Sequence, residues 1–155
     1  MKKLLLFLLL LPNLILSQKN QFYLEGNVGT SRLAIETGID YTDMTLIYEK
    51  KNVLNASALI GCVFPMGDYS LVDVQIGFSY PYIVTGKIGA GSYYGKKDQV
   101  AIILGIRPYP LAAYTQVNIG NKNKPHLIIS GELGSGGQIF MGTRNLFNAG
   151  LRLPI

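Results

Sequence analysis

The sequence predicts an all-β protein built from antiparallel, up-and-down strands. After residue 20 the chain consists of short runs in which apolar and polar residues alternate, the period of a strand with one apolar face. Clusters of Gly, Pro, Asn, Asp and Lys separate the runs, as turns require. No stretch keeps the 3.6-residue period of a helix, so we expect no helix in this part of the chain.

The alternation is clearest in residues 72–78, 99–107 and 112–119. The residues that it places on one apolar face are Val72, Val74, Ile76, Val100, Ile102, Leu104, Val117 and Ile119. Asp73, Gln75 and Gln116 fall on the opposite, polar face. These faces must lie in different environments, because successive side chains of a strand point to opposite sides.

Alternation alone fits either a soluble sandwich or barrel with its apolar face inside, or a membrane barrel with that face outside. Three features favour the antiparallel membrane β-barrel. The polar faces carry charged residues among glycines, which suits a narrow lumen with paired charges. Aromatic residues lie near the run ends, where membrane barrels have interfacial girdles. The runs span about nine to eleven residues, the length of a tilted transmembrane strand.

The expected strand number follows from the runs and the turns between them. Nine runs precede Leu133 and another begins near Leu146, which favours ten strands. This count assumes turns at residues 29–31 and 50–52. Eight strands is the alternative, if the two weak runs between residues 44 and 64 merge or stay irregular. An even number puts both termini on the periplasmic side.

Charged residues on the polar faces are expected to meet inside the barrel, because an unpaired charge there is costly. The expected lumen cluster comprises Glu25, Arg32, Glu36, Lys87, Arg107 and Arg152. A barrel has no free edge, so the last strand must pair with the first. We therefore expect residues 22–28 to pair with residues 147–154, with Glu25 and Arg152 on the same inner side.

The N-terminus has the pattern of an export signal. Two lysines precede an unbroken apolar run from Leu4 to Leu11, and Ser17 offers a small residue at a plausible cleavage site. The apolar stretch is shorter than the roughly 20 residues that a membrane-spanning helix needs. We expect residues 1–17 to be a cleaved signal peptide and residues 18–155 to form a single β-barrel domain.

The last eight residues resemble the terminal β-signal of bacterial outer-membrane β-barrel proteins. That signal is a polar residue, glycine two positions later, and apolar residues at the last position and two before it. Asn148, Gly150, Leu153 and Ile155 occupy the matching positions. The resemblance implies a small outer-membrane barrel that contacts outer-membrane lipid and is recognised by the barrel assembly machinery.

Other sites find little support in the sequence. The formal charge is +5, but the lysines are scattered over turns, so we expect no nucleic-acid partner. We expect neither a cofactor nor a metal, because no spacing matches a phosphate loop, a calcium loop or a zinc site. His126 shares a face with Ser130 and Glu132, residue types found in lipid-modifying barrel enzymes. Positions 126 and 130 are roughly 13 Å apart along a strand, too far for a nucleophile and its base.

The expected function is an integral outer-membrane barrel with short loops, without enzymatic activity. It would be structural, or would bind or pass a small solute. The first alternative is a soluble periplasmic or secreted β-sandwich or barrel that binds a ligand. The second alternative is a membrane-embedded lipid-modifying enzyme. The sequence leaves the oligomeric state open.

Overall fold

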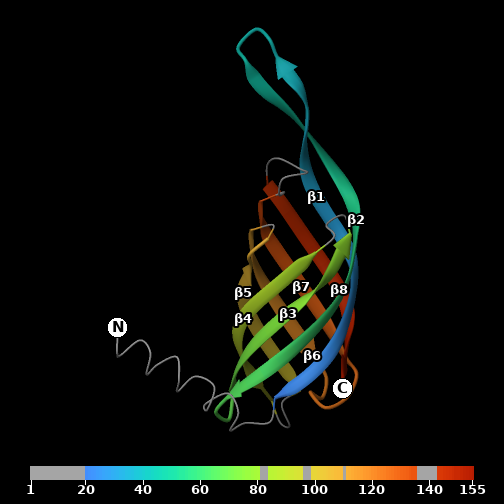
Figure 1. The fold of residues 1–155 in the computed structure, drawn as a ribbon, viewed down its shortest axis with the longest axis vertical. Helices are drawn as coiled ribbons and strands as arrows, with labels where there is room; N and C mark the ends of the chain where they lie inside the picture. The colour runs from blue at the N-terminus through green and yellow to red at the C-terminus, as the bar shows by residue number, and fades with distance from the viewer. Residues whose placement is uncertain (1–19, 81–83, 96–98, 110, 136–142) are drawn as a thin grey trace, which may run out of the picture.

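The chain forms a closed antiparallel barrel of eight strands in a computed structural model. The structure describes residues 20–80, 84–95, 99–109, 111–135 and 143–155. The strands are β1 (Gln21–Asp40), β2 (Thr45–Met66), β3 (Ser70–Tyr80), β4 (Thr85–Tyr94), β5 (Val100–Arg107), β6 (Ala112–Ile119), β7 (His126–Ser135) and β8 (Thr143–Pro154). Each strand pairs with its neighbours in the chain, and β1 closes the barrel against β8 (Figure 1).

The favoured count of ten strands was wrong, and the alternative of eight is observed. The expected turns at residues 29–31 and 50–52 lie inside β1 and β2, which run uninterrupted for 20 and 22 residues. β1 pairs with β8 only as far as Leu33, and β2 pairs with β3 only from Ala56 onward. Beyond the Leu33–Lys51 pair the two strands pair only with each other, and this part, residues 34–50, is called the distal ribbon below.

The distal ribbon projects from the end of the barrel opposite the start of β1 and the end of β8 (Figure 1). The end at which β1 starts and β8 ends is called the end that carries the termini below. This connection therefore departs from the short loops expected from the sequence. The ribbon turns at residues 41–44, where Met44 has a φ of 57°. Four runs of the sequence are thus two long strands.

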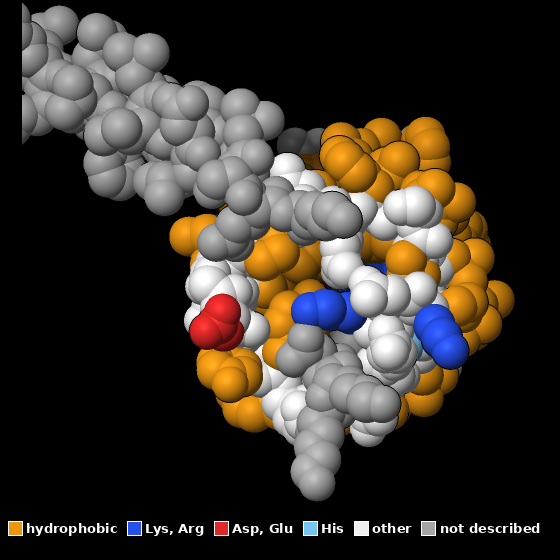
Figure 2. Space-filling view, turned by 90° about the horizontal axis from the view of Figure 1, so that it is seen from below, with side chains coloured by type: hydrophobic (Ala, Val, Ile, Leu, Met, Phe, Trp, Pro, Cys, Tyr) orange, Lys and Arg blue, Asp and Glu red, His pale blue; other side chains and the backbone are white. Residues whose placement is uncertain are grey.

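The barrel wall separates an apolar outside from a polar inside. The side chains of Ile76 and Leu104 are 60% and 61% exposed on the outer face. Asp73 and Gln116, by contrast, are fully buried in the lumen. All eight residues assigned to the apolar face point outward, which confirms the predicted orientation. Figure 2, seen from the end that carries the termini, shows hydrophobic side chains around the circumference.

Two inward-facing glycines make room for the tyrosines that fill the lumen. A Cβ atom on Gly61 would lie 2.2 Å from the ring of Tyr23, and one on Gly89 would lie 2.4 Å from the hydroxyl of Tyr114. Both distances are far shorter than a van der Waals contact, so any larger residue would displace a ring. Small residues at these wall positions therefore allow large side chains to occupy a narrow barrel.

Short turns join β2 to β3 and β6 to β7 at the end that carries the termini. Gly67 and Gly120 have φ values of 86° and 132°, which glycine adopts without steric cost. No helix within the described residues is long and apolar enough to span a membrane.

Candidate functional site

Among the side chains that the structure describes, acidic and basic residues are equally numerous in the lumen. Its buried charged residues are Glu25, Asp73, Glu132, Lys87, Arg107 and Arg152, three of each sign among the described residues. They form two groups along the barrel axis. The proximal cluster (Tyr23, Glu25, Asp73 and Arg152) lies nearer the termini, and the distal cluster (Lys87, Arg107 and Glu132) lies nearer the opposite end.

The proximal cluster is centred on Arg152 of β8. Arg152 lies directly opposite Glu25 in the β1–β8 register, and its Nε and Nη2 atoms lie 3.1 and 2.7 Å from Glu25 Oε2. The same Nη2 donates to Asp73 Oδ2 of β3 at 2.8 Å. The Tyr23 hydroxyl also donates to Asp73, and the guanidinium carbon of Arg152 lies 3.6 Å from the centroid of the Tyr23 ring. One arginine therefore joins three strands.

The distal cluster is centred on a carboxylate instead. Glu132 Oε1 of β7 lies 2.9 Å from Lys87 Nζ of β4 and 2.7 Å from Arg107 Nη2 of β5. Lys87 Nζ also lies 5.2 Å from the centroid of the Tyr114 ring, within the range of a cation–π contact. The proximal cluster has a formal charge of −1 and the distal cluster +1, so the six buried charges sum to zero.

The structure places four residues of the expected lumen cluster inside the barrel: Glu25, Lys87, Arg107 and Arg152. The predicted pairing of β1 with β8, with Glu25 and Arg152 on the same inner side, is confirmed. The expected cluster omitted two acidic members, Asp73 and Glu132. Their inward positions in the alternating pattern were the available signal, because buried cations require carboxylates within reach.

Arg32 does not belong to the lumen. It is exposed and has the same parity along β1 as the outward-facing Leu24 and Val28. The prediction assumed a turn at residues 29–31 that would reset the alternation, whereas β1 continues through it. The side chain of Glu36 lies outside the described part of the structure.

Side chains fill the lumen at the end that carries the termini. The cavity there measures only about 20 Å³ and is bounded by Tyr23, Tyr93, His126 and Arg152, among others. That volume accommodates about one water molecule. Lys122 lies across this mouth, with Nζ 4.9 Å from the centroid of the Tyr93 ring. Among the described residues, this packing leaves little free volume at this end of the lumen.

His126, Ser130 and Glu132 share the inner face of β7 but do not form a catalytic arrangement. His126 Nδ1 lies 2.9 Å from the backbone carbonyl oxygen of Lys124. Glu132 is paired with the two cations of the distal cluster. The histidine and the glutamate are thus each held by partners outside the group of three.

The residues that match the β-signal all lie on the described part of β8 or just after it. Asn148 and Gly150 occupy inward positions, whereas Leu153 and Ile155 are exposed on the outside. A Cβ on Gly150 would lie 2.1 Å from Asn27 Oδ1 and from the carbonyl oxygen of Gly26, so glycine is also required for packing. The expected signal peptide, residues 1–17, lies outside the described residues.

Comparison with known proteins relates the chain to membrane barrels by structure. No protein-family profile and no curated protein sequence matches it. A structure reported under "De novo design of transmembrane beta-barrels" has a TM-score of 0.50 and 12% identity, covering 89% of this chain and 98% of its own. Neisserial surface protein A (NspA) has a TM-score of 0.45 and 14% identity, covering 88% and 99%. The likeness to the designed barrel shows that the chain has a transmembrane β-barrel fold.

Proposed function

We propose that the chain is an integral outer-membrane barrel with a filled lumen, and that its role is structural or ligand-binding. The observation that carries this proposal is the polarity of the wall, with apolar side chains outside and six charges inside. A soluble barrel would have the opposite arrangement, because water would contact its outer face. A bilayer covers such an apolar belt, and a closed barrel leaves no unpaired strand edge in lipid.

The two ends of the chain support this location. Residues 1–17 have the pattern of an export signal, and the last strand carries a match to the β-signal. In outer-membrane barrels the short turns are periplasmic and the longer connections are extracellular. We therefore assign the end with the termini to the periplasm and the distal ribbon to the cell exterior.

Solute passage and catalysis are less compatible with the geometry than binding. Tyrosine rings and salt bridges occupy the lumen, and the periplasmic mouth has room for about one water molecule. His126 and Glu132 have partners other than Ser130. We expect the purified barrel to show no channel conductance in a planar bilayer. Stable single-channel steps would contradict a filled lumen.

Fractionation tests the membrane location directly. The full-length chain, expressed in a Gram-negative host, should sediment with outer membranes and be released by detergent but not by salt or alkali. Without boiling, it should migrate on gels as a compact, heat-modifiable form. Recovery as a soluble periplasmic protein without detergent would refute the proposal.

A matched pair of variants separates the assembly signal from lipid contact. Leu151 and Leu153 are both exposed on the outer face of β8, at 55% and 46%, but only Leu153 occupies a signal position. If the assembly machinery reads the signal, Leu153→Ser should reduce the amount of folded barrel in cells more than Leu151→Ser. Equal reductions would show that both residues act only through contact with lipid.

A further inference from the structure

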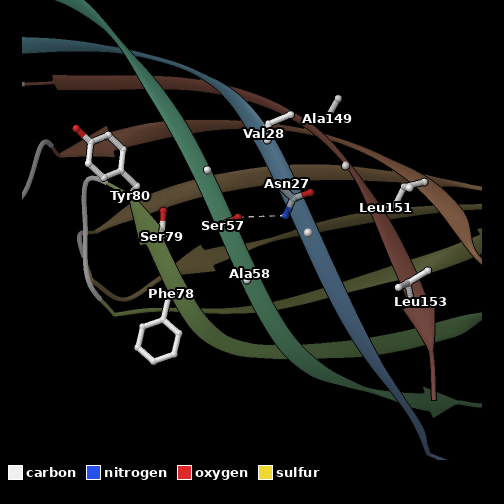
Figure 3. Close-up of a pocket in the computed structure, with 13 residues that line it drawn as sticks. Asn27, Val28, Ser57, Ala58, Phe78, Ser79, Tyr80, Ala149, Leu151 and Leu153 are labelled. Atoms are coloured by element: carbon white, nitrogen blue, oxygen red, sulfur yellow. Dashed lines mark hydrogen bonds between the residues drawn. The ribbon is translucent and has the colours of Figure 1, made fainter.

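An apolar groove of about 980 Å³ crosses the outer wall of β8, β1, β2 and β3 (Figure 3). Its floor consists of small residues: Gly26, Ala56, Ala58 and Ala149. Phe78 and Tyr80 of β3 border one side, and Leu151 and Leu153 of β8 border the other. These four side chains are between 46% and 65% exposed, so they stand out from the wall on either side of the floor.

Two basic side chains lie beyond one end of this groove, on the same outer face. Val28 of the groove pairs with Ala56, and four residues further along β1 Arg32 pairs with Asn52. Lys50 is the next outward position on β2. Both side chains are exposed; Arg32 lies on β1 just before the distal ribbon begins, and Lys50 is the last residue of the ribbon on β2.

The spacing between the groove and the basic side chains matches one leaflet of a bilayer. Arg32 is six residues from Gly26, which is about 20 Å along a strand. A strand tilt of about 35–45° reduces this to about 14–16 Å of depth. Half of a hydrocarbon core of about 30 Å is about 15 Å. When the groove floor lies near the membrane midplane, Arg32 therefore reaches the level of the lipid headgroups. Lys50 pairs with Ala34, two residues further along β1, and so lies about 5 Å further out, within the headgroup region.

We propose that the groove binds a membrane lipid with an anionic phosphate headgroup. An acyl chain lies over the small residues of the floor, and Arg32 and Lys50 bind the phosphate through charge-assisted hydrogen bonds. The site rests on the proposed membrane location, since only an inserted barrel presents this face to lipid. The alternative occupant, a second copy of the chain, is an outcome of the test below.

Tryptophan quenching by brominated lipid tests this site, because the chain contains no tryptophan. Phe78→Trp places a reporter at the edge of the groove, and Ile106→Trp places a control on the outer face of β5, away from it. Each variant is reconstituted in phosphatidylcholine vesicles that contain either brominated phosphatidylglycerol or brominated phosphatidylcholine. Heat-modifiable migration verifies that every variant is folded.

We expect the reporter at position 78 to prefer phosphatidylglycerol, and the preference to fall about fivefold with each basic residue removed. Arg32→Gln and Lys50→Gln should each lower it, whereas Lys124→Gln, in an exposed turn at the other end, should not. Ala149→Phe, which fills the groove floor, should abolish the preference. Ala90→Phe, an equal change on the outer face of β4, should leave it intact.

Three results would overturn the site, and they are distinguishable. Equal quenching by the two lipids at both positions would show an inserted barrel without a selective site. Quenching at position 106 but not at position 78 would show that a second copy of the chain covers the groove. Absence of quenching at both positions would refute membrane insertion, and the proposed function with it.

Discussion

Removing Arg152 tests whether the proximal cluster stabilises the barrel. The guanidinium makes hydrogen bonds of 2.7, 3.1 and 2.8 Å to Glu25 and Asp73, whose side chains are both 0% exposed. In Arg152→Met two buried carboxylates lose their cation. Breaking a buried pair in this way costs about 3–5 kcal/mol, since the remaining charge has no solvent to stabilise it. We expect the free energy of unfolding to fall by that amount.

An exposed ion pair of similar geometry provides the control. Lys51 Nζ lies 3.1 Å from Glu49 Oε2 at the base of the distal ribbon, but the two side chains are 53% and 55% exposed. Lys51→Met should therefore cost less than about 1 kcal/mol. Adding Glu25→Gln to Arg152→Met should recover part of the lost stability, because it removes one of the two isolated charges.

The assay is equilibrium urea unfolding of the barrel in lipid vesicles, followed by the heat-modifiable band and by circular dichroism. The reasoning is refuted if Arg152→Met costs no more than Lys51→Met. It is also refuted if Glu25→Gln destabilises the Arg152→Met variant further, because the carboxylate would then be stable without its arginine.

Three other changes should have measurable effects. Ile102→Arg, on the outer face, should cost about 2–4 kcal/mol in vesicles if this position lies near the midplane; an unchanged unfolding midpoint would contradict a lipid-covered wall. Gly61→Val should cost about 1–3 kcal/mol by displacing the Tyr23 ring; a smaller cost of Gly61→Val in a Tyr23→Ala background than in the unchanged chain would identify that contact as the cause. Hydrogen bonds from Thr45 hold the pKa of Asp43 below its usual range. The ionised carboxylate therefore stabilises the ribbon turn at pH values above the ordinary pKa of an aspartate, and this stabilisation is lost as the pH falls through the lowered pKa. Hydrogen exchange of the Thr45 amide should accelerate at acidic pH and should not do so in Asp43→Asn.

The sequence predicted the two faces of the wall better than the number of strands. Alternation assigns Ile102 and Gln116 to opposite faces whatever the strand count, because the period of two is local. The count failed because residues 29–31 and 50–52, which have the composition of turns, are strand residues. Residues 29–31 pair with both β2 and β8 in the barrel wall, and residues 50–52 lie on β2 before its pairing with β3 begins. Arg32 was misplaced for the same reason, one residue out of phase with the lumen.

The outer groove could not have been predicted from local patterns. Gly26, Ala58 and Ala149 are distant in the chain and become neighbours only through the registers of β1 with β2 and β8. Asp73 and Glu132 likewise meet their partners across several strands. Sequence patterns identify which side of a strand a residue occupies, whereas its neighbours depend on register.

Closure of the barrel also neutralises charge between the two ends of the chain. Arg152 is 127 positions from Glu25 and 79 positions from Asp73. A chain that stopped before β8 would present two carboxylates to the lumen without the arginine that binds them. Such a truncated sheet carries an electrostatic penalty against entering the bilayer in addition to its open edge. The final strand thus brings the counter-charge for the first, so that only a completed chain removes both penalties at once.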